Sequence, residues 1–484
     1  MDLQSIKSLT KFISAIGIGL SLFFFIPIIC AFIYHEEVKT ILISNLIFLG
    51  INFSIFSLLS NHPFKMGIKE SILAVNLIWI LLGIAGGGAL YLTTDIKLAD
   101  AFFEAISGFT TTGATIFTDI ESLSHTTLML RSLMHWLGGM GIIVLGVGLL
   151  TLINPTGSMT LFKAESTGIK MEKLTPKIKD TAIRLWRIYI FLTVIDAILL
   201  WAEGMSLFDA VNHAFSTIST GGFSTKNESL GFWKDNPLIL WTTTVFMLLS
   251  GINFIAHLKF LKKDTSGYRS EEVKWYLIVF FSLSFTLTLL HLIQSNDSLF
   301  YSLTHSFFTI SSILTTTGFA SLDYEKWGYA ATATIFVAML IGGNAGSTAG
   351  GVKVIRYVVL FKNLFVQIKK ILHPNAVIGI FVDNNKVSSH ILGSVTAFFF
   401  LFALTNTALT LYLYAKGYTF MTSFSASIAC IGNIGPGFAD VGPTQNFSFF
   451  SSFDKVLLAI FMIIGRLEFY TFIILLTKDF WRKY

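Results

Sequence analysis

The chain has 484 residues, of which 53% are hydrophobic and only 13% charged, and its mean hydropathy is +0.70. Ordinary soluble domains carry about 25% charged residues, so this composition excludes a typical soluble enzyme and indicates an integral membrane protein. The formal net charge of +6 is small and gives no indication of nucleic-acid binding. The two cysteines, Cys30 and Cys430, lie in or beside apolar segments and predict neither a disulfide framework nor a metal site.

Two apolar runs, 10–33 and 40–60, begin the chain, and each is long enough to cross about 30 Å of hydrocarbon as a helix. The short acidic link at 35–39 predicts that they form a transmembrane hairpin, residues 1–69, that precedes the rest of the fold. Because no small-residue cleavage site follows the first run, it is predicted to be a retained helix rather than a signal peptide.

After residue 69 one arrangement recurs four times: a long apolar run, a short apolar stretch, a glycine-containing loop and a second long run. The long runs are 70–93 and 128–152, 182–203 and 237–258, 274–294 and 329–360, and 390–415 and 455–477. The short stretches are 99–109, 206–218, 299–313 and 418–431. Apolar stretches this short predict re-entrant helices. We therefore predict four pore units, 70–179, 180–270, 271–386 and 387–484.

The loops of the four units align on Gly113, Gly222, Gly318 and Gly435, which are separated by 109, 96 and 117 residues. Non-helical backbone at membrane depth is tolerated only where it is buried in protein or lines a wet cavity. Glycine permits the positive φ that turns carbonyls toward an axis, so four such loops predict a ring of carbonyls, as in an ion filter. The alternative is four glycine turns that cap buried helices. The candidate filter residues are Thr111, Thr112, Gly113, Thr220, Gly221, Gly222, Thr316, Thr317, Gly318, Asn433, Ile434 and Gly435.

The third re-entrant helix is predicted to be about one turn longer than the second. His305 precedes its aligned glycine by thirteen residues, whereas His213 precedes its own by nine. His135, His213, His257 and His305 have no metal-ligand spacing among them, and no chemistry is assigned to them.

A glycine-rich segment interrupts the second long run of the third unit. Five glycines in ten residues disfavour a regular helix, because each costs about 1 kcal/mol relative to alanine. The segment lacks the Gly-Lys-Ser/Thr of a phosphate-binding loop. It predicts either a plug or hinge below the filter or simply close helix packing, and the plug is favoured because the other units show no such interruption. Its residues are Gly342, Gly343, Asn344, Ala345, Gly346, Ser347, Thr348, Ala349, Gly350 and Gly351.

Arg466 lies in the middle of the last apolar run, where an arginine costs at least ~2.5 kcal/mol unless it faces a cavity or a partner. It is interpreted either as a charge that faces a cavity or as a structural pair with Glu468 or a loop carbonyl. The glycine clusters at 86–88 and 138–141 predict close helix packing.

Lysines and arginines are distributed unevenly between alternate loops, with about 25 in segments assigned to the inside against eight, Arg131 among them, outside. This distribution places both termini in the cytoplasm and lets all four loops enter from outside. Every unit then has the same orientation, which argues against the inverted repeats of many secondary transporters.

The four glycine loops, the segment 342–351 and the pair Gly465-Arg466 resemble the TrkH/KtrB family, within the superfamily of potassium transporters that includes fungal Trk and plant HKT proteins. The resemblance covers nearly the whole chain, and the N-terminal hairpin favours the TrkH branch. It implies an all-α polytopic membrane protein with four helix–pore loop–helix units around a pseudo-fourfold pore. About ten spanning helices and four re-entrant helices are expected.

The resemblance further implies potassium uptake across the cell inner membrane, with K⁺ bound at the filter residues, 342–351 as the gate and Arg466 beneath the filter. It implies a homodimer and a cytosolic regulatory ring of the TrkA type, which would carry the nucleotide, NAD or ATP/ADP. The chain itself is expected to hold no cofactor, to bind no nucleic acid and not to be an enzyme. Two positions depart from the family pattern: Asn344 replaces a small residue or cysteine, and Ala349 interrupts a run of glycines.

Two other classes of function are weighed against this channel-like transporter. A symporter coupled to H⁺ or Na⁺ needs intramembrane acidic residues, and few are present apart from Glu468. A polytopic membrane enzyme needs a clustered acid, base or metal constellation, whereas Asp100, Glu104 and Asp209 are scattered at the starts of the predicted re-entrant helices.

Overall fold

The computed structural model describes residues 3–62, 67–148 and 177–482. Four predicted features lie outside these residues: the end of the apolar run 128–152, Lys65, the basic stretch from 163 to 176, and Lys483.

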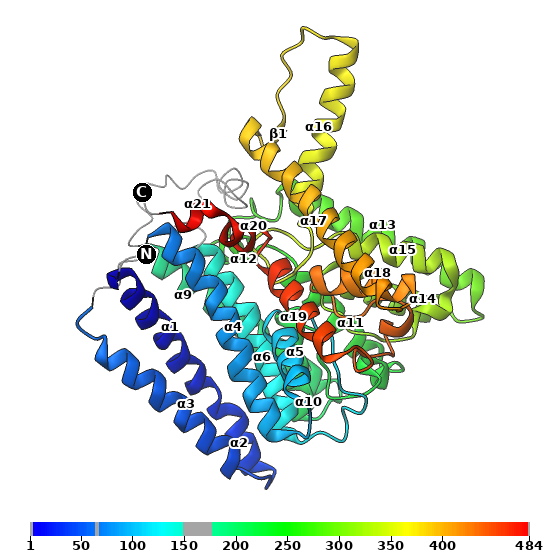
Figure 1. Ribbon diagram of the computed structural model, residues 1–484. Helices are drawn as coiled ribbons and strands as arrows, with labels where there is room; N and C mark the ends of the chain where they lie inside the picture. The colour runs from blue at the N-terminus through cyan, green and yellow to red at the C-terminus, as the bar shows by residue number, and fades with distance from the viewer. Residues whose placement is uncertain (1–2, 63–66, 149–176, 483–484) are drawn as a thin grey trace.

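The described part of the chain is almost entirely helical (Figure 1). Its first helices are α1 (Leu3–Phe23), α2 (Phe25–Ile33), α3 (Lys39–Leu58), α4 (Ile68–Thr93), α5 (Leu98–Phe109) and α6 (His125–Gly148). The middle of the chain forms α9 (Lys177–Ala202), α10 (Leu207–Ile218), η2 (Ser229–Trp233), α11 (Pro237–Ser250), α12 (Phe254–Leu261), α13 (Glu271–Gln294), α14 (Leu299–Leu314), η3 (Tyr324–Trp327) and α15 (Gly328–Leu340). The last elements are α16 (Val354–Leu372), β1 (Phe381–Val382), β2 (Asn385–Lys386), α17 (Ser389–Ala415), α18 (Phe420–Ile431), η4 (Ala439–Val441), α19 (Ser452–Arg466), α20 (Tyr470–Ile473), η5 (Ile474–Leu476) and α21 (Lys478–Trp481).

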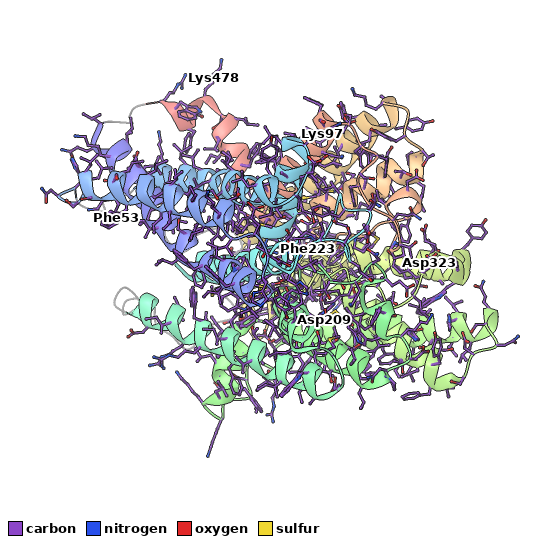
Figure 2. All side chains as sticks on the ribbon, turned by 90° about the horizontal axis from the view of Figure 1, so that it is seen from below. Phe53, Lys97, Asp209, Phe223, Asp323 and Lys478 are labelled. Atoms are coloured by element: carbon purple, nitrogen blue, oxygen red, sulfur yellow. The ribbon has the colours of Figure 1, made fainter. Side chains whose placement is uncertain are left out.

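The first three helices lie along one flank of the molecule (Figure 1). α1 and α3 pack along each other, and the Nδ2 of Asn45 donates to the Ser21 carbonyl at 3.1 Å. Phe53 on α3 is 60% exposed and lies at the periphery of the molecule in Figure 2. An exposed phenylalanine on such a long apolar helix is typical of a surface that faces lipid.

Four times, a long helix is followed by a short one that packs against it: α4 by α5, α9 by α10, α13 by α14, and α17 by α18. α5, α10 and α18 have 12 residues each, a length of about 18 Å that does not cross a bilayer. α14 has 16 residues, so the prediction of one extra turn in the third short helix is confirmed. Every residue of α14 from Thr304 to Leu314 is buried, which places this helix inside the bundle.

Three breaks interrupt the helices that follow the short ones. α11 and α12 are bent by 97° around residues 251–253, and α19 and α20 by 112° around residues 467–469. The third break is the longer segment between α15 and α16. The prediction that only the third unit would be interrupted is therefore wrong. At the last break Glu468 and Phe469 both adopt positive φ, which ends α19 although neither residue is a usual helix breaker.

These breaks also change the number of continuous spans. Six helices in the described ranges are long and apolar enough to cross a membrane, or up to eight if each bent pair is one span. The expectation of about ten spanning helices stays a prediction, because three of the apolar runs are divided by non-helical backbone and only the described residues are counted here.

α16 and the small antiparallel hairpin of β1 and β2 extend away from the body of the molecule (Figure 1). The hairpin pairs Phe381 with Lys386 and Val382 with Asn385. α21 lies near the start of α4, where Lys69 Nζ donates to the Arg482 carbonyl at 2.7 Å.

Glycines allow two of the long helices to approach the short helices closely, as the sequence predicts for the cluster at 138–141. A Cβ added to Gly138 of α6 would overlap the carbonyl oxygen of Phe109 at the end of α5. Gly86 of α4 is similarly close, because a Cβ added there would lie 2.8 Å from Cε2 of Phe109 in α5. A Cβ added to Gly141, one turn after Gly138, would have no atom of the described residues within 4 Å.

We expect Gly138→Ala to destabilise the protein by about 1–3 kcal/mol, because the added methyl group overpacks the α5–α6 contact. Gly141→Ala is the matched control in the same helix and is expected to leave stability unchanged or raise it by up to about 1 kcal/mol. Thermal unfolding of both variants in detergent measures the difference. Equal melting temperatures for the two variants would contradict this account of Gly138.

Candidate functional site

The four short helices end in the same hydrogen-bonded turn, the Schellman motif. At the end of α5, Thr111 N donates to the Gly108 carbonyl at 3.1 Å and Thr112 N donates to the Ser107 carbonyl at 2.9 Å. The corresponding pairs are Thr220 to Thr217 and Gly221 to Ser216, Thr316 to Ile313 and Thr317 to Ser312, and Asn433 to Cys430 and Ile434 to Ala429. The backbone turn is therefore repeated even where the letters of the loops differ.

The first residue after each helix cap adopts the left-handed conformation without being glycine. The φ angles are 54° at Thr111, 54° at Thr220, 56° at Thr316 and 53° at Asn433. For a β-branched residue this conformation is a genuine outlier, and each such residue costs on the order of 1–3 kcal/mol. Three threonines at this position mean that the surrounding structure holds three of the four loops in a strained geometry, whereas asparagine tolerates this conformation in the fourth.

The aligned glycines come next, and each packs against the neighbouring loop. Their φ angles are 82° at Gly113, 85° at Gly222, 83° at Gly318 and 94° at Gly435. A Cβ on Gly113 would overlap the carbonyl oxygen of Gly221, one on Gly222 that of Thr317, and one on Gly318 that of Ile434. A Cβ on Gly435 would lie 2.5 Å from the Thr112 carbonyl oxygen, so the fourth loop contacts the first. The four loops thus meet in a closed cycle in chain order.

A side chain from each short helix forms a hydrogen bond with the extended, non-helical segment that follows the aligned glycine. We call this segment the strand of its loop, although it belongs to no β-sheet. Glu104 of α5 accepts from Thr115 Oγ1 at 3.0 Å and from Ile116 N at 2.9 Å. The other three contacts are His213 Nε2 with Ser224 Oγ at 2.9 Å, His305 Nδ1 with Ser321 Oγ at 2.9 Å, and Ser425 Oγ donating to the Phe438 carbonyl at 3.0 Å. We refer to these four contacts as the helix–strand brackets.

Sequence reasoning gave these histidines no role. The sequence does contain one sign of this role. Glu104 and His213 each precede the aligned glycine of their loop by nine residues, so equivalent positions carry a side chain that can form a hydrogen bond with the strand. Among the described residues, no group of three or more His, Cys, Asp or Glu side chains is placed to hold a metal ion.

Hydrogen bonds also join each unit to the segment that follows the glycine in a neighbouring loop. Arg131 Nη1 donates to the Ser224 carbonyl at 3.3 Å, and Gly231 N donates to the Ala320 carbonyl at 3.0 Å. Tyr324 Oη donates to the Gly437 carbonyl at 2.8 Å, and Phe447 N donates to the Thr115 carbonyl at 2.8 Å. All four neighbouring pairs of loops are therefore tied together outside the glycines. Figure 2 shows Phe223, the residue after Gly222, near the middle of the molecule.

The aligned glycines and the segments that follow them enclose a cavity of about 100 Å³. This volume has room for several water molecules. All four aligned glycines line it. Its charged lining residues are Arg131 and Lys226, and no carboxylate is among the lining residues. Lys226 lies over the Phe232 ring at 4.7 Å.

The segment 342–351 lies against the opposite side of the loops. Gly350 N donates to Thr316 Oγ1 at 2.6 Å, and Thr348 Oγ1 donates to the Ile218 carbonyl at the end of α10 at 3.0 Å. A Cβ on Gly350 would lie 2.6 Å from the carbonyl oxygen of Gly432, at the end of α18. Apart from Gly346 and the partly exposed Gly351, its residues are buried. The segment therefore contacts the ends of three short helices or their loops.

Polar contacts hold this segment in place from below. Ala345 N donates to Glu272 Oε1 at 2.7 Å, and Lys353 Nζ donates to the Ala349 carbonyl. Lys353 and Arg356 belong to the loop charges that the sequence assigns to the inside, which predicts that they are exposed there, but both are buried. Arg356 pairs with Glu468 at 2.6 Å. That assignment is wrong for these two side chains, because they satisfy groups inside the protein.

Arg466 is the last residue of α19 and not the middle of a helix, as the sequence had suggested. It is only 5% exposed, and its Nη1 donates to the Thr348 carbonyl at 3.0 Å. Of the two structural partners considered, the loop carbonyl is the one that it contacts, since Glu468 pairs with Arg356. Its Nε and Nη2 have no hydrogen-bond partner in the described part of the chain.

A family model described as TrkH, cation transport protein, matches residues 39–483. The Trk system potassium uptake protein TrkH of Salmonella typhimurium is 38% identical over 421 residues, which are 86% of this chain and 86% of the relative. TrkG of Escherichia coli, another Trk system potassium uptake protein, is 34% identical over 463 residues, covering 94% of this chain and 95% of its own.

The crystal structure of the potassium transporter TrkH from Vibrio parahaemolyticus superimposes with a TM-score of 0.90 at 31% identity, covering 99% of this chain and all of that one. The family model and the curated relatives each cover most of the sequence. The chain therefore belongs to the TrkH family of cation transport proteins.

Proposed function

We propose that this protein carries K⁺ into the cell across the inner membrane, through a pseudo-fourfold pore whose filter is the cycle of loops around Gly113, Gly222, Gly318 and Gly435. The observation that carries the proposal is the closed contact of each aligned glycine with a carbonyl of the next loop. The names of the relatives support K⁺ as the transported ion. The proposal includes the division of the chain into four helix–pore loop–helix units.

The chemistry of the loops suits a cation. Carbonyl oxygens can replace the hydration shell of K⁺, and backbone oxygens need no side chain to supply charge. α5, α10, α14 and α18 all end at the cycle, so their carboxyl ends place about half a negative elementary charge each on its inner side. Four such dipole ends offset the absence of a carboxylate among the residues that line the cavity.

The segment 342–351 is proposed to be the gate, which blocks the inner side of the filter when it is packed as described. Its support is the contact of Gly350 with Thr316 and of Thr348 with Ile218, directly below two filter loops. Arg466 stabilises this closed arrangement through its hydrogen bond to Thr348 and adds a positive charge at the same level. The gate and Arg466 then oppose conduction together.

Partners are also proposed. We expect a homodimer and a cytosolic TrkA-type ring that carries the regulatory nucleotide, with no cofactor in this chain and K⁺ as cargo. Both termini are proposed to be cytoplasmic. Within the described residues, the inner basic surface is provided by exposed side chains such as Lys262, Lys263, Lys369 and Lys370.

A K⁺ symporter coupled to H⁺ or Na⁺ is the second candidate. Sequence reasoning counted few intramembrane acids, but Asp196 of α9 is fully buried beside Thr217 of α10. A buried carboxyl group in a spanning helix is a candidate proton site. This observation keeps coupling as the alternative to passive conduction.

The filter assignment is tested by Gly113→Ser, which adds a Cβ against the Gly221 carbonyl and strains a position with φ of 82°. We expect the K⁺/Na⁺ permeability ratio to fall by about tenfold, since strain of this kind costs on the order of 1–3 kcal/mol. Gly417→Ser is the matched control, because Gly417 also has positive φ but no atom of the described residues within 4 Å of a Cβ.

Reversal potentials in mixed K⁺ and Na⁺ gradients across proteoliposomes give both ratios. An unchanged ratio in Gly113→Ser would count against the filter. A wild-type reversal potential that moves with a pH gradient would favour the coupled symporter instead.

The gate is tested by Arg466→Ala and by deletion of residues 346–349. Each should raise K⁺ flux on the order of tenfold without changing the K⁺/Na⁺ ratio, since a hydrogen bond from a charged donor contributes about 1.5–3 kcal/mol. Arg482→Ala is the control, because that side chain is 68% exposed and pairs with Asp479 of the terminal helix α21. The gate proposal fails if both variants reach the membrane folded and conduct no faster than wild type.

The partner surface is tested by reversing Lys262, Lys263, Lys369 and Lys370 to glutamate. We expect capture of a TrkA-type protein to be lost, because four like charges would replace the basic inner surface. Reversal of the exposed lysines Lys97, Lys234 and Lys326, which lie in predicted outer segments, should leave capture unchanged. Equal capture by all three proteins would remove the inner lysines from this role.

A further inference from the structure

A buried ion pair lies directly beside the proposed filter. Glu104 of α5 and Arg131 of α6 are 2.9 Å apart between Oε1 and Nε, and their side chains are 0% and 1% exposed. The sequence placed Arg131 among outer loop charges, whereas it is a buried residue of α6; for Glu104, counted among the scattered acids, the pattern gave no sign of this partner. Burying two charges in this way is costly unless hydrogen bonds satisfy the remaining donors and acceptors.

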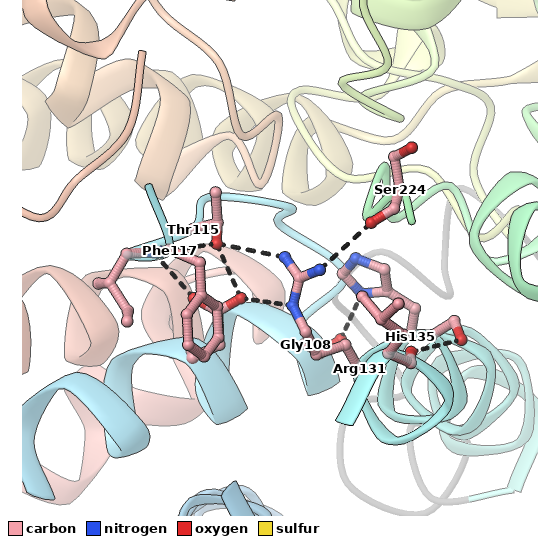
Figure 3. A network of polar contacts seen from close by, with 10 residues as sticks. Gly108, Thr115, Phe117, Arg131, His135 and Ser224 are labelled. Atoms are coloured by element: carbon pink, nitrogen blue, oxygen red, sulfur yellow. Dashed lines mark hydrogen bonds and ion pairs between the residues drawn. The ribbon is translucent and has the colours of Figure 1, made fainter. Parts of the chain in front are cut away.

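The pair satisfies those groups with the strands of two neighbouring loops. Arg131 Nη2 donates to Thr115 Oγ1 at 3.2 Å and Nη1 donates to the Ser224 carbonyl at 3.3 Å (Figure 3). Its guanidinium lies over the Phe223 ring at 4.1 Å. Thr115 and Ser224 each follow their aligned glycine by two residues, so the pair spans the first and second loops at the same level.

The same arginine lines the cavity that all four aligned glycines face. A positive charge at the mouth of a cation filter repels K⁺ unless a negative charge lies close to it. Glu104 supplies that charge from behind the strand, where it accepts from Thr115 and Ile116 and is itself removed from the cavity lining.

We propose that Glu104 and Arg131 are positioning residues of the filter with two separable effects. The hydrogen bonds of Arg131 fix the spacing between the first and second filter loops and so contribute to selectivity. The charge of Glu104 cancels that of Arg131 and so keeps the cavity accessible to K⁺. This inference rests on the proposed filter function.

The test uses Glu104→Gln, Arg131→Gln and the double variant in proteoliposomes. Glu104→Gln leaves the arginine charge uncompensated, so we expect the apparent KM for K⁺ to rise by about tenfold or more. The double variant lacks both charges of the pair and keeps Lys226 as in wild type, so its KM is expected to return to within about threefold of wild type. Its K⁺/Na⁺ permeability ratio should nevertheless fall, because the hydrogen bonds that span the two loops are gone.

Asp100→Asn is the matched control. Asp100 of α5 forms a second largely buried ion pair with Lys455 of α19 at 2.6 Å, but neither residue lines the cavity. This variant should lower thermal stability while leaving both KM and the permeability ratio unchanged. Arg131→Gln, which leaves Glu104 without its partner, should lower the ratio without raising KM.

Three outcomes would overturn the proposal: a double variant whose KM stays as high as that of Glu104→Gln, a double variant with wild-type selectivity, or a double variant that does not fold. If Glu104→Gln alone fails to accumulate, the double variant decides, since it is expected to fold, transport and lose discrimination. Failure of the filter itself is recognised separately, because Gly113→Ser would then also leave the permeability ratio unchanged.

Discussion

The fold depends on one constraint: a glycine of each loop must touch a backbone carbonyl of the next loop, and the fourth must touch the first. A side chain at any of these positions would push two loops apart. The contact can close only if α5, α10, α14 and α18 end at matching levels, which explains why all four finish in the same Schellman turn. The strain at Thr111, Thr220 and Thr316 is tolerated because the brackets and the links between strands fix the loops from outside.

The breaks after α11 and α19 expose groups that form hydrogen bonds with the segment 342–351, on the side of the loops opposite the cavity. At the break after α11, the carbonyls of Gly251 and Ser250 accept from Asn344 N at 2.9 Å and Thr348 N at 3.3 Å. At the end of α19, Arg466 donates to the carbonyl of the same Thr348. Breaks in two other helices thus supply partners for the buried backbone of the segment 342–351, which has no helix or strand of its own to satisfy it.

The repeat of the loops, the length of α14 and the helix break at 342–351 could be predicted from the sequence, because each depends on a local pattern of residues. The aligned glycines repeat nearly letter for letter in two loops, and the thirteen-residue offset of His305 gave the extra turn of α14. The glycine content of 342–351 correctly excluded a helix there. These features depend on residues close together in the chain.

Features that depend on distant partners could not be read in this way. Nothing near Arg131 in the sequence shows that Glu104, 27 residues earlier, is its partner, so hydropathy alone placed it in an outer loop. The burial of Lys353 has a different cause: its acceptor, the Ala349 carbonyl, is only four residues earlier, but a backbone acceptor leaves no signal in the residue types. The break after Arg466 comes from positive φ at Glu468 and Phe469, for which neither residue type gives a signal.

The brackets differ from one loop to the next: a carboxylate paired with arginine, two imidazoles bound to serines, and a serine hydroxyl on a carbonyl. All four loops belong to one polypeptide, so the cycle closes as an intramolecular step that does not depend on protein concentration. Loops as alike as Thr110–Ala114 and Thr315–Phe319 could, however, exchange places during folding. The brackets of these two loops are unlike, a carboxylate for the first and an imidazole for the third, so the contacts of the short helices favour the native pairing over an exchange of these loops.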